Sequence, residues 1–145
     1  MFGFNNFKKH SMFVLLMTLI CGCTPTVTQI NDYVNRVPYK SDIDNWGQLN
    51  YVSKPHEFYK KGGDCEDYVT AKIHEIKKYG LPVKMYVIVG ELLTGEGHAV
   101  LKVKDGERVY ILDNESNSLL DIMYLQNFKR YIQISSETWL RIYKI

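Results

Sequence analysis

Three residues carry side chains that could cooperate in nucleophilic catalysis, namely Cys65, His98 and Asp113. A thiolate is a strong nucleophile, and a neighbouring imidazole can accept the proton that the thiol must lose. A carboxylate beside the imidazole fixes its tautomer and stabilises its protonated form. These residue types predict a thiol hydrolase that forms an acyl-enzyme with an amide substrate. They leave open whether water or an amine then accepts the acyl group.

The cysteine count supports a chemical role for Cys65. The chain contains three cysteines, and Cys21 and Cys23 both lie near the N-terminus. If the first leaves with a signal peptide and the second carries a lipid, Cys65 is the remaining thiol and has no disulfide partner. An unpaired thiol outside the cytoplasm is exposed to oxidation, so catalysis is a reason to keep it. The alternative is a buried, inert cysteine.

A helix is predicted to present Cys65 on its first turn. Gly62-Gly63-Asp64 reads as a turn, and Asp64 is a good N-cap residue for a helix that continues to about Tyr79. Along this helix, an apolar row with helical spacing contains Cys65, Val69, Ile73 and Ile76. The thiol is therefore expected on the side of the helix that meets the core, close to the positive end of the helix dipole.

A β-hairpin is predicted to bring His98 and Asp113 together. Segments 98–104 and 107–113 flank Asp105-Gly106, a two-residue hairpin signal. With these two residues as the turn, His98 falls directly opposite Asp113, on the same face of the ladder. Val100, Val109 and Ile111 would share that face and form an apolar patch, on which the helix that carries Cys65 is expected to pack.

The remaining pattern predicts an α+β fold in which N-terminal helices pack on an antiparallel sheet. Short helices are expected at 28–37 and from Pro55, and further strands at 83–89, 132–135 and 139–143. The length of 145 residues suits one domain, expected over 41–145, after a tether over 23–40.

Acidic residues crowd the predicted nucleophile. Asp64, Glu66 and Asp67 surround Cys65, and like charge raises the pKa of a thiol. One interpretation is that these carboxylates only cap the helix. The other is that they hold a cation, for which their oxygen ligands suit Ca²⁺. A bound dication would cancel the negative charge beside the thiol.

The N-terminus has the pattern of an export signal. Lys8 and Lys9 precede a nine-residue apolar run, Met12–Ile20, which is too short to span a bilayer. Gly22-Cys23 then resembles a bacterial lipobox, so residues 1–22 are predicted as a lipoprotein signal peptide and Cys23 as the lipidation site. The alternative is an ordinary secretory signal or an N-terminal anchor. Because residue 24 is threonine rather than aspartate, an outer-membrane location is favoured over retention in the inner membrane if the host is Gram-negative.

The charge of the chain gives no indication of a nucleic-acid partner. The formal charge is +2, and removal of Lys8 and Lys9 would leave the mature chain near neutrality. A nearly neutral domain lacks the basic surface that nucleic-acid binding requires. The partners expected are a protein substrate and, through the lipid, a membrane. The sequence does not indicate the oligomeric state.

The motifs around the three residues resemble those of the bacterial transglutaminase-like cysteine proteinases. The similar stretches are Gly62–Tyr68, Gly97–Leu101 and Ile111–Asn114. The resemblance implies a papain-like fold of the transglutaminase core type and the triad Cys65, His98 and Asp113. Well-known members are periplasmic, Ca²⁺-dependent proteases that clip surface adhesins, which implies that Asp64 and Glu66 hold the ion. This chain is shorter than those proteases and carries the lipobox, so cleavage of an adhesin does not follow.

Two other functions remain open from the sequence. Many lipoproteins with an Asp-Cys motif are cell-wall peptidases of another papain-like family, although those typically continue Asp-Cys-Ser-Gly rather than Asp64-Cys65-Glu66-Asp67. The second alternative is a non-catalytic binding module that reuses the fold. The presence of cysteine, histidine and aspartate together argues against it.

Overall fold

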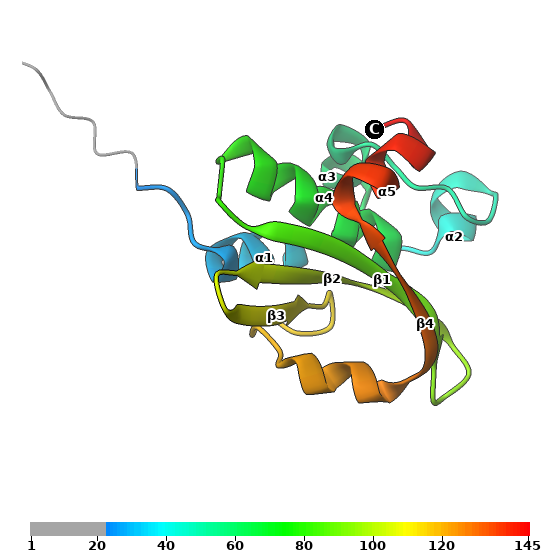
Figure 1. Cartoon of the computed structure of the whole chain (residues 1–145). Helices are drawn as coiled ribbons and strands as arrows, with labels where there is room; N and C mark the ends of the chain where they lie inside the picture. Colours follow the sequence, from blue (N-terminus) through cyan, green and yellow to red (C-terminus); the bar gives the residue numbers. More distant parts are fainter. Residues whose placement is uncertain (1–22) are drawn as a thin grey trace, which may run out of the picture.

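A computed structural model describes residues 23–145, in which helices cover one face of a four-stranded antiparallel sheet (Figure 1). The predicted α+β class is confirmed. The strands are β1 (Lys84–Leu92), β2 (Gly97–Asp105), β3 (Arg108–Leu112) and β4 (Phe128–Ser135), in the spatial order β3-β2-β1-β4. The helices are α1 (Val27–Asn35), α2 (Asp42–Trp46), α3 (Pro55–Lys61), α4 (Cys65–Lys78), the 3₁₀ helix η1 (Ile122–Asn127) and α5 (Ser136–Tyr143).

Helix α4 is the centre of the helical layer. It contacts β2, α1 and α3, and Val69, Ile73 and Ile76 are buried in the main core as its apolar row predicts. Cys65 packs against the edge of this core. Short helix α3 begins with Pro55 at its first position, as expected from the fixed φ of proline.

The hairpin between β2 and β3 forms, but its register differs from the prediction. Asp105 pairs with Arg108 and Leu101 with Leu112, so the turn consists of Gly106 and Glu107. Gly106 has a φ of +58°, which suits glycine at the first central position of a type II′ turn. The partner of every β2 residue is therefore displaced by two residues. Because side chains alternate with period two, this displacement leaves each residue on its predicted face.

The face assigned to helix α4 is wrong. Ala99, Leu101 and Val103 of β2 pack against α4 in the main core, whereas Val100 and Ile111 belong to a second cluster with Leu125, Phe128 and Ile88. That second cluster lies under η1 and the start of β4, on the opposite face of the sheet (Figure 1). Because β2 is buried on both faces, its sequence is apolar on both, and the pattern alone cannot say which face receives the helix.

The segment from Trp139 to Tyr143 is helical, so the strand predicted there is wrong. Ser135 caps helix α5 by accepting the N–H of Thr138 at 3.2 Å. Trp139 is a buried residue of this helix and donates its indole N–H to Thr70 of α4 at 3.0 Å. The short, aromatic-rich segment has strand-like composition, but the N-cap and the contact with α4 favour the helix.

The N-terminal part of the described chain is packed on the domain from α1 onwards. Residues 23–40, expected as a tether, include α1, and its Ile30 and Val34 are buried in the main core. Cys23 precedes this helix and is exposed. The predicted signal peptide, residues 1–22, lies outside the described residues. Within residues 23–145, no helix combines the length and apolar character needed to cross a bilayer.

Candidate active site

The turn before Cys65 is built on two glycines in close contact with their surroundings. A Cβ on Gly62 would lie 2.3 Å from the backbone oxygen of Pro38, and one on Gly63 would lie 2.1 Å from a carboxylate oxygen of Asp67. Gly63 in turn bridges to Tyr39 in the preceding loop. The glycines therefore allow the 38–40 loop to lie directly against the first turn of α4.

Cys65 lies half-buried on the first turn of α4, in an environment that keeps its thiol protonated. Burial, and next the charges of Glu66 and Asp64, raise the pKa of the Cys65 thiol to about 12, although the N–H of Ala99 acts in the opposite direction. The sulfur lies 3.9 Å from Oε2 of Glu66. The thiol therefore needs either a proton acceptor or neutralisation of these carboxylates before it can act as a nucleophile.

His98 and Asp113 form a buried pair. Nε2 of His98 lies 3.0 Å and 3.1 Å from the two carboxylate oxygens of Asp113, and the side chains are 8% and 1% exposed. Burial lowers the pKa of His98, but the hydrogen bond and charge of Asp113 outweigh burial and raise the pKa overall. Because Nε2 is taken by the carboxylate, Nδ1 is the ring nitrogen left for the thiol.

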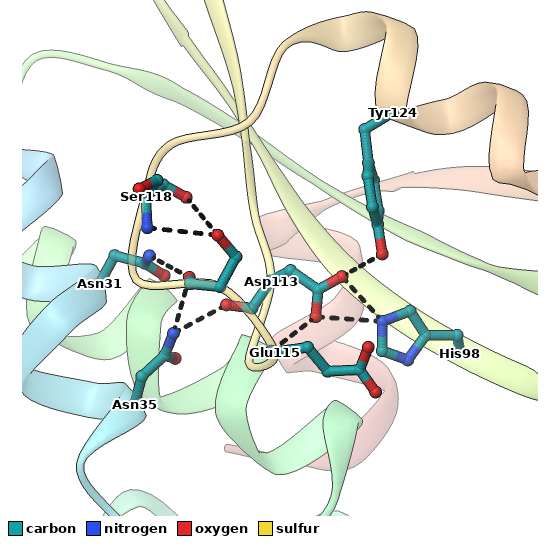
Figure 2. A network of polar contacts seen from close by, with 8 residues as sticks. Asn31, Asn35, His98, Asp113, Glu115, Ser118 and Tyr124 are labelled. Carbon is teal, nitrogen blue, oxygen red and sulfur yellow. Dashed lines mark hydrogen bonds and ion pairs between the residues drawn. The ribbon is translucent and has the colours of Figure 1, made fainter.

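The side chains of His98 and Asp113 meet by a route that the sequence analysis did not predict. Asp113 follows Leu112, the last residue of β3, and so it is not the ladder partner of His98. It lies diagonally across the hairpin on the same face, which keeps it within reach. Asn35 of α1 donates to the backbone oxygen of Asp113 at 2.8 Å and holds this loop in place (Figure 2).

A pocket connects the thiol with the imidazole. It has a volume of about 460 Å³ and lies at the end of the sheet where β2 begins. Its lining consists of Tyr39, Cys65, Leu92, Glu96, Gly97, His98, Asn114 and Glu115. Cys65 thus comes from the N-terminus of α4 and His98 from the first residues of β2, and both open onto the same space. A substrate chain in this pocket would contact both groups.

An acidic cluster adjoins Cys65, and its residues both cap α4 and have oxygens close enough together for a cation. Carboxylate oxygens of Asp64 and Glu66 lie within 4.8 Å of each other, as do those of Asp42, Asp64 and Asp67. Asp64 occupies the N-cap position of α4 in a capping box with Asp67. Its Oδ1 is buried and has no hydrogen-bond partner among residues 23–145, and the same holds for Oδ1 of Asp42. Buried, unpaired carboxylate oxygens that converge are suited to a hard dication such as Ca²⁺.

The acidic residues divide into two roles by their contacts. Asp67 has both oxygens occupied, because it accepts the N–H and hydroxyl of Ser53 at 2.6 and 2.8 Å and the N–H of Asp64 at 3.1 Å. Asp42 accepts one N–H, from Tyr51 at 2.6 Å, and has its other oxygen free. Burial and neighbouring negative charges raise the pKa of Asp64 to about 7. Asp64 therefore belongs to two possible sets of metal ligands, one with Glu66 and one with Asp42, and Asp67 stabilises the turn.

Two residues of this site were not found from the sequence. Asp42 joins the acidic cluster from α2, and Tyr124 of η1 donates its hydroxyl to Asp113. Neither belongs to a local motif. For Asp42, a signal was present in the acidic run around Cys65, which calls for additional oxygen ligands, but nothing in the sequence says which carboxylate supplies them.

Comparisons with known proteins agree on the family and the fold. The sequence matches the family described as bacterial transglutaminase-like cysteine proteinase BTLCP over residues 14–144. No curated protein matches. A structure of Legionella pneumophila LapG has a TM-score of 0.62 at 21% identity, covering 81% of this chain and 74% of that chain. EGTA-treated LapG has a TM-score of 0.60 at 22% identity, covering 78% of this chain and 67% of that chain. Calcium-bound LapG has a TM-score of 0.60 at 21% identity, covering 77% of this chain and 67% of that chain.

The family match extends over nearly the whole described chain and includes every element that forms the pocket. The resemblance inferred from the three motifs is thereby confirmed. LapG shares the arrangement of helices and sheet at low identity, so the likeness to it concerns the fold. The chain belongs to the bacterial transglutaminase-like cysteine proteinases and is a cysteine peptidase of the transglutaminase-like fold.

Proposed function

We propose that this cysteine peptidase is a membrane-tethered thiol hydrolase that cleaves protein amide bonds with Cys65, His98 and Asp113 as its triad. One observation carries the proposal. His98, which is buried and paired with Asp113, lines the same pocket of about 460 Å³ as Cys65, which lies at a helix N-terminus. This arrangement provides a nucleophile, a base, an orienting carboxylate and room for a substrate chain.

In the first step, the Cys65 sulfur attacks the carbonyl carbon of the scissile amide. Nδ1 of His98 takes the thiol proton and passes it to the leaving amine nitrogen, so the C–N bond breaks and a thioester remains. Asp113 stabilises the protonated imidazole through Nε2. Backbone N–H groups at the start of α4 stabilise the negative oxygen of the tetrahedral intermediate.

In the second step, water replaces the leaving amine. His98 takes a proton from the water, whose oxygen attacks the thioester carbonyl. The C–S bond breaks, the sulfur regains the proton, and the acid product leaves. An amine in place of water would give a transamidation by the same route.

Calcium belongs to the proposed site through Asp64 and Glu66, joined by Asp42. The free, buried oxygens of Asp42 and Asp64 support this assignment, and so does the calcium-bound form of the similar LapG. Bound Ca²⁺ would supply positive charge beside Cys65, where Glu66 and Asp64 otherwise raise the pKa of the thiol. The ion would therefore favour the thiolate, and it would also fix the start of α4.

The proposed location is the periplasmic face of a membrane, through a lipid on Cys23. Cys23 is exposed and lies just ahead of Thr26, the N-cap of α1, so a lipid there would not disturb the core. The basic start and apolar run before it match an export signal. The outer membrane is favoured because threonine follows the cysteine.

The function is tested by comparing cells that carry the wild-type chain with cells that carry Cys65→Ala. Because the alanine variant lacks the nucleophile and keeps the fold, new N-termini in surface and secreted proteins should appear only with the wild type. Equal sets of N-termini in both strains would refute the peptidase assignment. Soluble muropeptides released only by the wild type would favour a cell-wall substrate instead.

A further inference from the structure

Both oxygens of the Asp113 carboxylate have a protein donor besides His98. The N–H of Glu115 donates to Oδ1 at 3.0 Å, and the hydroxyl of Tyr124 donates to Oδ2 at 2.5 Å. Figure 2 shows Tyr124 approaching the carboxylate from the opposite side to Asn35. The carboxylate is thus held at both ends while it faces Nε2 of His98.

Tyr124 reaches the site from the sheet face that α4 does not cover. It lies on η1, and Asp121 fixes the start of this helix. The side chain of Asp121 accepts the N–H of Met123, and its backbone oxygen accepts the N–H of Tyr124. The Tyr124 ring packs edge-on against Phe128 at 6.4 Å, and Phe128 stacks on His98 at 6.2 Å. The hydroxyl is therefore placed by packing that does not depend on its own hydrogen bond.

The position of Asp113 explains why its carboxylate needs this support. Asp113 lies beyond the last residue of β3, so ladder hydrogen bonds do not fix it. Its side chain is 1% exposed, so water cannot replace a lost donor. With the tyrosine hydroxyl removed, Oδ2 would be a buried acceptor held by His98 alone, and the carboxylate would turn away from the plane of the imidazole.

We propose that Tyr124 is a positioning residue of the triad, whose hydroxyl holds the Asp113 carboxylate in the orientation that stabilises protonated His98. This inference rests on the proposed function, in which His98 accepts the thiol proton. Burial raises the pKa of Tyr124, and its hydrogen bond to Asp113 raises it further, so the hydroxyl stays protonated and remains a donor. The same bond, with those from His98 and Glu115, offsets burial and lowers the pKa of Asp113.

The test uses Tyr124→Phe, which keeps the ring and removes the hydroxyl. The probe is iodoacetamide, and its rate of reaction with Cys65 in the whole chain is measured across a pH series. In the proposed mechanism His98 takes the thiol proton near neutral pH, so the variant should react about tenfold more slowly there. At alkaline pH the thiolate forms without the imidazole, and the two rates should converge.

The matched control is Tyr131→Phe. Tyr131 also packs edge-on against Phe128, at 5.9 Å, but it is 47% exposed and has no hydrogen bond to Asp113, so its profile should equal that of the wild type. NMR titration of the histidine ¹⁵N signals gives a second readout. The His98 signal, assigned by its loss in His98→Gln, should titrate at lower pH in Tyr124→Phe.

The outcomes separate this inference from the proposed function. A profile for Tyr124→Phe that superimposes on the wild type overturns the role of Tyr124. So does a uniform slowing at every pH with His98 unchanged, because that pattern reflects packing alone. If wild-type Cys65 reacts no faster than free cysteine both with and without Ca²⁺, the proposed function fails, and the His98 titration alone then decides whether Tyr124 holds the carboxylate.

Discussion

At the scale of single residues, Lys72 is an unusual ionisable group outside the proposed triad. It lies two helical turns after Cys65 and is 1% exposed. Burial lowers the pKa of its amine to about 7, against a smaller opposing effect of Asp113. The described residues provide no ion pair for it, only the ring of Tyr68 at 5.9 Å. The folded chain therefore carries a cost for charging this group.

We predict that Lys72 makes the stability of the fold rise with pH. Between about pH 7 and pH 10 the unfolded chain holds a proton on Lys72 that the folded chain lacks, so the free energy of unfolding increases over this window. Below it, the folded state bears the full cost of a buried ammonium group. Lys72→Met should remove this slope and stabilise the fold by roughly 2–4 kcal/mol at acidic pH.

Urea unfolding of both proteins across this pH range measures the effect. Lys60→Met, on the exposed side of α3, is the control and should keep the wild-type slope. An unchanged slope in Lys72→Met would mean that Lys72 is charged in the folded state at all these pH values.

At the scale of elements, a bound metal ion would stabilise the start of α4. Its N-cap residue Asp64 and the neighbouring Asp42 of α2 have buried oxygens that no described residue contacts with a hydrogen bond. We predict that Ca²⁺ raises the melting temperature of the chain, since an ion that binds the native state alone stabilises it by mass action. The rise should be several degrees at about a hundred times the dissociation constant, and EGTA should reverse it.

Scanning fluorimetry with and without Ca²⁺ measures this prediction in matched variants. Asp42→Asn should abolish most of the shift, because it removes a buried carboxylate ligand. Asp44→Asn, on the same helix but exposed and bonded to Ser41 at 2.7 Å, should preserve it. An equal shift in both variants would exclude Asp42 from the ligands.

The elements differ in how well the sequence predicts them. Helix α4 and the β2–β3 hairpin follow from local signals, the glycine turn before Cys65 and the Asp105-Gly106 dipeptide. Local signals do not predict the exact turn residues, because one turn signal fits two registers. They also do not predict the face of β2 that receives α4, because Val100 and Leu101 are both fully buried. Helix α5 depends on Trp139 reaching Thr70 of α4, a contact between distant segments.

The candidate site divides in the same way. Cys65, His98 and Asp113 are indicated by residue type and by motif. In the structure His98 pairs with Asp113, and Cys65 and His98 line one pocket. Tyr124 and Asp42 depend on the fold, because each enters the site from an element that a local pattern does not connect to it. Supporting residues of this kind are visible only once the chain is folded.

At the scale of the whole molecule, the lipid on Cys23 would decide where the peptidase works. We predict that Cys23→Ala moves the chain from the membrane fraction to the soluble fraction and abolishes metabolic labelling by an alkyne fatty acid, because the acyl chains supply the apolar area that holds it on a bilayer. Reactivity of Cys65 with iodoacetamide should not change, since Cys23 is exposed and lies outside the pocket. Membrane retention of the variant would point to an uncleaved N-terminal anchor.

Helix α1 determines how far the N-terminus of this protein can be truncated without loss of function. Asn31 and Asn35 donate to the backbone oxygens of Ser116 and Asp113, and Ile30 and Val34 fill the core beneath. A chain trimmed to begin at Tyr39 would keep Cys65, His98 and the pocket lining. It would lose helix α1 and therefore the hydrogen bonds that hold the Asp113 loop. Each lost hydrogen bond removes about 1 kcal/mol of stability. A recombinant catalytic fragment should therefore start ahead of Thr26.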